Sequence, residues 1–300
     1  MNRFLKLLAI ILFPMLVFAV FTETLLRTAP NVYKYKYEWM QENAENVEVL
    51  VLGNSYAYLG ISPTFFSQKA FNLANVGQDA KQDDFLLHYW GKRYKKLKVV
   101  IIPIHYRTWN IGLMEDGNSI YRCRYYKLYM DCPLYGGNPL KYFELSEPRT
   151  AFKSLNSILH GRNSTGCDTL GFGALSSSAA DEKVAIRDAK EHTASNTEKR
   201  SHNYKYISNI ASFCKEHDIA LLLVTPPMWK FYYDALNTEQ LNTMRSKADL
   251  VAKDYDALYL DYSESKEFTA SDFTDGHHLN EQGAKKFSKI LNKEINRVIN

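Results

Sequence analysis

A serine placed directly after an apolar run is the first residue of this sequence that could do chemistry. Residues 47–52 consist mostly of Val and Leu, and they lead into Gly53-Asn54-Ser55. An apolar run that ends at a glycine turn is typical of a buried strand in a parallel sheet. Ligands bind at the carboxyl ends of such strands, so the Ser55 hydroxyl would be presented above the sheet as a nucleophile. A serine that only caps the following helix fits the same pattern, and the motif alone does not decide between the two.

The second chemical candidate is an acid–histidine pair near the end of the chain, in Asp275-Gly276-His277-His278. An Asp three residues before a His can fold its carboxylate back onto the imidazole. The carboxylate then holds one tautomer and stabilises the cation that forms when the ring accepts a proton. We therefore predict Ser55 as the nucleophile, His278 as its base and Asp275 as the partner of that base. His277 is left as an alternative base or as a packing residue.

The elements that must position these groups alternate between short apolar runs and stretches with helical spacing. Strands are predicted over residues 47–52, 70–73, 99–104, 219–224 and 257–260. Helices are predicted over residues 82–94 and 204–214, from 238 onwards and after 280. This alternation predicts an α/β fold, a three-layer sandwich around a central parallel sheet.

Residues 107–200 interrupt the alternation. Gly, Ser, Asn and Tyr dominate there, and no regular spacing persists. We interpret this stretch as a partly helical insertion over the edge of the sheet that serves as a lid or a docking surface. The predicted organisation is an anchor over residues 1–27, a linker over 28–46 and one domain over 47–300 that contains the insertion.

The N-terminal segment predicts where the protein works. Arg3 and Lys6 precede an uncharged, apolar run from Leu7 to Thr22. Its length fits a short membrane helix or the core of a signal peptide, with a weak cleavage site after Ala19. We favour an uncleaved anchor with a cytoplasmic N-terminus. The protein is then a single-pass cell-membrane protein whose domain lies outside the cytoplasm, in the periplasm.

Composition narrows the partners. The formal net charge is +4, and the basic residues are scattered without a stripe that alternates with aromatic side chains. Nucleic acid is therefore not an expected partner. The sequence has no Cys-x-x-Cys or His-rich spacing, so we expect no metal and no other cofactor. Cys123 and Cys132 could pair in an oxidising compartment, or all four cysteines could be thiols.

Taken together, the motifs resemble the SGNH, or GDSL-like, hydrolase superfamily. Gly53-Asn54-Ser55 matches the first block of that family, and residues 275–278 match the last. Phe71-Asn72-Leu73-Ala74-Asn75-Val76-Gly77 looks like the second block, in which a glycine amide joins the oxyanion hole. The resemblance implies that the amides of Ser55 and Gly77 hold the oxyanion. It extends from about residue 47 to 299 but does not include the insertion.

One block departs from the family pattern. The family usually supplies an Asn side chain after the third strand, whereas this chain has Pro103-Ile104-His105-Tyr106 and then Asn110. Either Tyr106 or Asn110 replaces the missing donor, or the oxyanion hole is weaker. Losing one such donor typically lowers the rate about a hundredfold or more.

Among anchored proteins, the chain is similar to SGNH-like proteins that O-acylate envelope polysaccharides, including the alginate acetylation and D-alanine transfer families. That resemblance implies transfer of an acyl group, through an acyl-Ser55 intermediate, to an envelope glycan. It also implies a multi-span membrane acyltransferase of the MBOAT class as partner. Two alternatives remain: an esterase that uses the same residues, and a non-catalytic SGNH-like protein that binds glycan for a membrane acyltransferase.

Overall fold

The computed structural model describes residues 2–110, 120–133, 138–161, 164–175, 179–193 and 202–300. These ranges contain a five-stranded sheet whose paired strands all run parallel, in the order β2-β1-β3-β4-β5. The strands are β1 (Val49–Val51), β2 (Ala70–Asn72), β3 (Val99–Pro103), β4 (Ala220–Thr225) and β5 (Leu258–Asp261). The predicted α/β fold with a central parallel sheet is confirmed.

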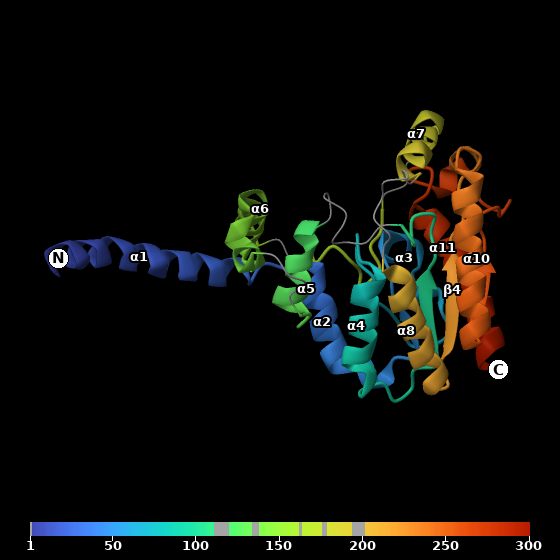
Figure 1. Ribbon diagram of the computed structural model, residues 1–300, viewed down its shortest axis with the longest axis horizontal. Coiled ribbons are helices and arrows are strands. Elements are labelled where there is room, and N and C mark those ends of the chain that lie inside the picture. Colours follow the sequence, from blue (N-terminus) through green and yellow to red (C-terminus); the bar gives the residue numbers. More distant parts are fainter. Residues whose placement is uncertain (1, 111–119, 134–137, 162–163, 176–178, 194–201) are drawn as a thin grey trace.

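Successive residues of each strand point to opposite faces of the sheet and build two cores. Leu50 and Val100 belong to one core, and Val49 and Val99 belong to the other. The first core is covered by α2 (Val32–Asn43), α4 (Ala80–Gly91), α8 (Asn203–Glu216) and α10 (Thr238–Tyr255). The second is covered by α3 (Ser55–Gly60) and α11 (Glu281–Ile299). The result is three layers with the sheet in the middle (Figure 1).

The segment that we expected to be a linker, residues 28–46, is instead largely helix α2. Asn31 caps this helix by accepting a hydrogen bond from the Lys34 amide. Tyr33 and Met40, two turns apart, are buried in the same core as the sheet. Only a few positions of α2 contact the core, and its sequence is rich in Tyr and Lys. An apolar face therefore could not be recognised in this segment.

Residues 107–200 contribute three helices among the described residues: α5 (Cys123–Tyr129), α6 (Pro148–Leu159) and α7 (Glu182–His192). Helix α7 buries Ala185 and Ala189 and packs against α9 (Lys230–Tyr233). Short 3₁₀ turns occur at Ala44–Asn46, Pro63–Phe65, Ile120–Arg122, Pro139–Tyr142, Glu144–Ser146 and Ala270–Asp272. The four cysteines, all of which are described, are not joined by disulfides.

Helix α1 (Asn2–Leu26) extends away from the rest of the protein (Figure 1). Its apolar side chains from Phe4 to Phe21 are exposed, with Phe4 68 % and Phe21 64 % accessible. Among the described residues it is the one helix long and apolar enough to cross a membrane.

Candidate active site

Ser55 lies where the chain leaves β1 and turns into α3. Gly53 takes a φ of 110°, a conformation that favours glycine. A Cβ atom at this position would lie 2.3 Å from Cδ of Pro103, so the close contact with β3 also requires a glycine. Asn54 caps α3 by accepting a hydrogen bond from the Tyr56 amide, which leaves Ser55 as the first helical residue. The turn thus places the serine at the carboxyl edge of the sheet.

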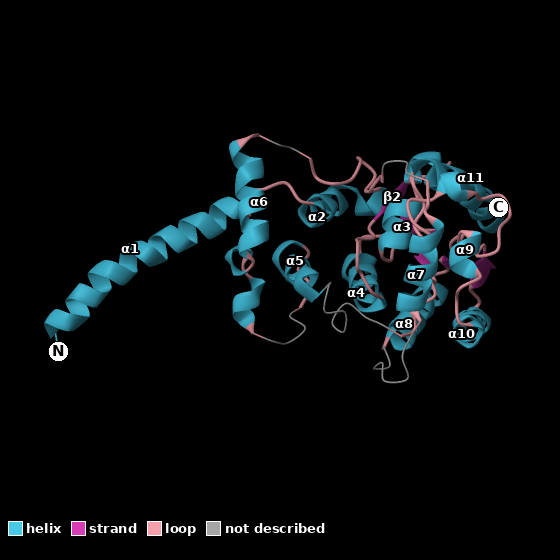
Figure 2. Cartoon of the chain, turned by 90° about the horizontal axis from the view of Figure 1, so that it is seen from above, coloured by secondary structure: helices cyan, strands magenta, loops and turns pink. Residues whose placement is uncertain are grey.

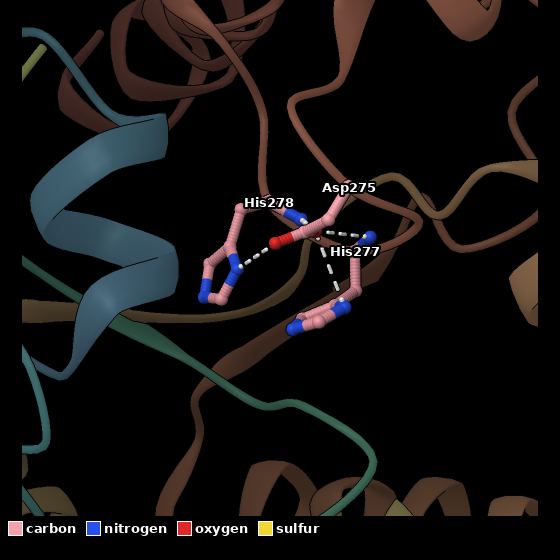
Figure 3. Close-up of side chains that lie close together, drawn as sticks. All are labelled: Asp275, His277 and His278. Carbon is pink, nitrogen blue, oxygen red and sulfur yellow. Dashed lines mark hydrogen bonds and ion pairs between the residues drawn. The ribbon is translucent and has the colours of Figure 1, made fainter. Parts of the chain in front are cut away.

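The other end of the chain brings His278 and Asp275 to the same place. Nε2 of His278 lies 2.8 Å from Oγ of Ser55. Nδ1 of His278 lies 2.9 Å from Oδ2 of Asp275. Figure 3 shows this imidazole beside the Asp275 carboxylate. The three side chains therefore form one continuous hydrogen-bonded row, although 220 positions separate Ser55 from Asp275 in the sequence.

Asp275 is held as a carboxylate. Burial raises its pKa, but the hydrogen bond and charge of His278 and the proximity of His277 outweigh burial and bring the pKa below its usual value. Its Oδ1 also accepts backbone N–H groups from His277 at 2.9 Å and His278 at 2.6 Å. An ionised Asp275 requires the proton of His278 on Nδ1, which leaves Nε2 to accept the proton of Ser55.

His277 lies on the same loop but has different surroundings. Its ring is buried, stacks on Tyr232 at 5.0 Å between centroids and meets His192 edge to face at 4.7 Å. Burial lowers its pKa well below the usual value, so the ring is neutral. The imidazole that contacts Ser55 is that of His278, whereas His277 packs against Tyr232 and His192 with its Nδ1 3.2 Å from Oδ1 of Asp275.

The two segments expected to supply oxyanion donors, residues 53–55 and 75–78, are joined by hydrogen bonds. Ser55 and Gly77 line the same pocket. The amide of Asn75 donates to the carbonyl of Gly53 at 3.1 Å. Oδ1 of Asp83 accepts from the Gly53 amide at 2.7 Å and from Nε2 of Gln78 at 2.6 Å. Burial raises the pKa of Asp83 to about 7. This buried carboxyl holds the 53–55 and 75–78 segments side by side.

Neither Tyr106 nor Asn110, our candidates for a further donor, is among the residues that line the pocket. The Tyr106 hydroxyl is buried elsewhere, where it accepts from the Asn237 amide at 3.0 Å. The chain turns directly after β3, with the Thr108 amide donating to the carbonyl of His105. This turn leaves His105, Arg107 and Thr108 among the residues that line the pocket.

His105 lines the pocket beside Asn54, shortly after the end of β3. Its Nε2 lies 2.7 Å from Nδ2 of Asn54, and its ring stacks on Tyr56 with centroids 4.6 Å apart. Burial lowers the pKa of His105 well below its usual value, and the nearby positive charge of Arg107 lowers it further. The ring is therefore neutral and fixes the Asn54 side chain next to the nucleophile.

The pocket itself has a volume of about 200 Å³. Sequence reasoning missed several residues that line it, including Arg107, His192 and Asn203. His192 is the last residue of α7, within the insertion, and burial lowers its pKa to about 4. No sequence signal marked these residues, because they reach the pocket only through folding: the insertion brings His192, the turn after β3 brings Arg107, and α8 brings Asn203.

Asp275, His277 and His278 also place their ligand atoms within 4.8 Å of one another, a spacing compatible with a metal ion. The Nδ1 of His278 is already hydrogen-bonded to Asp275, and its Nε2 faces Ser55. Asp275 and His278 therefore already take part in the serine–histidine–aspartate row, whereas His277 lies beside that row with its Nδ1 3.2 Å from Oδ1 of Asp275.

Comparison with known proteins gives distant likenesses. A family model that carries no descriptive name matches residues 178–300, less than half of the chain. No curated protein matches. A protein from Streptococcus pneumoniae described as a platelet activating factor is 13% identical, with a TM-score of 0.38, and covers 96% of this chain and 99% of its own. A family two carbohydrate esterase from Clostridium thermocellum, in complex with cellohexaose, is 11% identical, with a TM-score of 0.36, over 86% of this chain and 66% of its own. The chemistry of the site is therefore inferred from its own geometry.

Proposed function

We propose that this protein is an SGNH-type serine acyl enzyme that transfers an acyl group, with acetyl as the simplest case, to a hydroxyl of a cell-envelope polysaccharide. The observation that carries the proposal is the row from Ser55 Oγ through His278 to Asp275, with steps of 2.8 and 2.9 Å. Nucleophile, base and orienting carboxylate are the parts that acyl transfer requires.

In the first half of the reaction Ser55 Oγ attacks the carbonyl carbon of an acyl ester, and its proton passes to Nε2 of His278. The bond between the carbonyl carbon and the leaving oxygen then breaks, and His278 returns the proton to the leaving alcohol. The amides of Ser55 and Gly77 stabilise the oxyanion. In the second half an acceptor hydroxyl gives its proton to Nε2 of His278 and attacks the acyl carbon. The bond between that carbon and Ser55 Oγ then breaks, and His278 returns the proton to Oγ, which regenerates the free serine.

Helix α1 supports the proposal of an envelope acceptor. An exposed, apolar helix able to cross a membrane supports a single-pass anchor, and Arg3 and Lys6 before the apolar run favour a cytoplasmic N-terminus with the domain in the periplasm. A glycan of the envelope and a multi-span acyltransferase in the same membrane are then the partners within reach. Water as the acceptor would make the same site an esterase, and only the product distinguishes the two.

The test is intact mass spectrometry of the full-length protein after exposure to p-nitrophenyl acetate. We expect one acetyl group on wild type and none on Ser55→Ala or His278→Ala. Ser246→Ala, an exposed serine on α10, is the matched control and should be acetylated like wild type. Release of the acetyl group onto an envelope oligosaccharide indicates the transferase, and release only as acetate indicates the esterase. Absence of the adduct on a folded wild-type protein contradicts the proposal and favours a glycan-binding scaffold.

A further inference from the structure

Large exposed apolar side chains gather where α1 joins the rest of the protein. Outside α1, nine such residues are exposed among those described, and five of them lie between positions 140 and 159. They are Leu140 (68 %), Phe143 (43 %), Leu145 (38 %), Phe152 (71 %) and Leu159 (72 %). We call these five residues the junction surface. Exposed apolar residues concentrated in one region mark an interaction site, whereas isolated ones do not.

Helix α6, which carries part of the junction surface, is amphipathic. At 100° per residue, Ala151, Leu155 and Ile158 share a face with Phe152 and Leu159. The opposite side of the helix carries two exposed cations, Arg149 and Lys153. A helix with one apolar face and basic residues on the other side is typical of segments that lie in a membrane interface.

The junction surface is attached directly to α1. The carboxylate of Glu23, in the last turn of α1, accepts the backbone N–H groups of Glu144 and Leu145, each at 3.1 Å. Arg27 donates to the same carboxylate at 2.8 Å. Glu144 in turn faces the buried guanidinium of Arg124 on α5 at 3.8 Å. The turn over residues 144–146 is therefore fixed between the end of α1 and the folded domain.

The direction of α6 completes the arrangement. Figures 1 and 2 both show α6 at the C-terminal end of α1, between α1 and the rest of the protein. In both views α6 runs across the direction of α1. If α1 crosses a bilayer along its normal, a helix across its end lies in the plane of the membrane surface.

From these observations we infer that the junction surface inserts into the outer interface of the same bilayer that α1 crosses. Phe152 and Leu159 enter the boundary between headgroups and acyl chains, and Arg149 and Lys153 meet the headgroup phosphates. The inference goes beyond the proposed acyl chemistry and does not depend on it, but it does depend on α1 as the anchor. A single helix lets a domain swivel, and this second contact would fix one orientation of the domain on the membrane.

The experiment uses the full chain reconstituted in protein-free vesicles of phosphatidylcholine and phosphatidylglycerol. Cys167→Ser removes the one cysteine that is not buried, since Cys123, Cys132 and Cys214 are 5 % exposed or less. An NBD label is then placed at Phe152→Cys or, as a second variant, at Leu159→Cys. Leu250→Cys, on α10 and 46 % exposed, is the matched control. Spin-labelled lipids serve as quenchers.

We expect NBD at positions 152 and 159 to shift to the blue and to be quenched at least threefold more than NBD at 250. A label at Leu16→Cys reports on α1 itself. If NBD at position 16 is quenched but NBD at positions 152 and 159 is quenched no more than NBD at position 250, the inference is overturned and the anchor is retained. No quenching at 16 removes both the anchor and the inference. Because the vesicles contain no other protein, a junction surface that meets a protein partner instead would give the unquenched result. Acylation of Ser55 is measured separately, so its failure changes none of these readings.

Discussion

The two sides of the Ser55 pocket are built in different ways. On one side Asp275 and His278 lie within four consecutive residues, and the pair reaches Ser55 through a single 2.8 Å contact. On the other side the chain after β3 replaces the expected amide donor with His105 and turns Tyr106 into the core. Local spacing favours the contact between Asp275 and His278, whereas the position of His105 depends on how a loop turns. A role fixed by local geometry can be predicted from a sequence, and a role fixed by loop direction cannot.

The largest expected effect tests the first side directly. Ser55→Ala and His278→Ala should each lower kcat/KM for an acyl ester by about 10⁵-fold or more, because each removes part of one proton-transfer unit. The double variant should lose little more than either single one. Additive losses, measured by steady-state kinetics on folded protein, would show that the two residues do not act together.

A second comparison is between Asp275 and His277, which lie in the same loop. Asp275→Asn should lower kcat/KM by about 10³- to 10⁴-fold, because the amide no longer holds the reactive tautomer of His278. His277→Gln should change kcat/KM by less than about tenfold and should mainly lower the melting temperature, because its ring is buried against Tyr232. Equal losses in kcat/KM for the two variants would give His277 the role that we assign to His278.

The pH dependence of stability tests the buried carboxyl beneath Ser55. The pKa of Asp83 in the folded protein is about 7, above the ordinary value of 3.8. This raised pKa contributes stability that is complete below pH 3.8 and is lost as the pH rises to 7. Relative to Asp83→Asn, the free energy of unfolding of wild type should fall by up to about 4 kcal/mol between these pH values. Chemical denaturation at several pH values measures this, and parallel pH profiles for the two proteins would contradict it.

The smallest expected effects concern the side of the pocket formed by the chain after β3. His105→Ala should lower kcat/KM by about ten- to a hundredfold, because Asn54 and Tyr56 lose the ring that positions them. Tyr106→Phe and Asn110→Ala should change it by less than about threefold, while Tyr106→Phe lowers stability by about 1 kcal/mol through the lost hydrogen bond. A large kinetic loss at Tyr106 or Asn110 with normal stability would restore our original expectation for that residue.

The sequence carried enough information for the sheet and for the row of candidate residues. The strands are continuous apolar runs, because both faces of a parallel sheet are buried, and such runs can be recognised in a single sequence. Ser55 follows the first run, and the Asp275–His278 contact spans one turn. Each of these features depends on neighbours that are close in the chain.

The features that could not be predicted depend on distant packing. Helix α2 places only a few residues in the core, so its sequence looked like a linker. His192 reaches the pocket because α7 packs on α9, and Arg107 reaches it because the chain turns after β3. Neither contact has a counterpart in local spacing, and the helical periodicity that residues 148–159 carry belongs to α6, which does not line the pocket.

Helix α2 also has a consequence for how far the domain can lie from the membrane. Because α2 belongs to the domain, only residues 27–31 separate the apolar helix α1 from the folded core. Even fully extended, so few residues span no more than about 20 Å. On a chain anchored by α1 this short connection keeps the domain at the membrane surface, so the domain cannot reach a polymer farther out. Under the proposed function, a glycan acceptor would therefore have to come to the membrane surface, so that chains emerging from the membrane would be acylated in preference to finished polymer farther out.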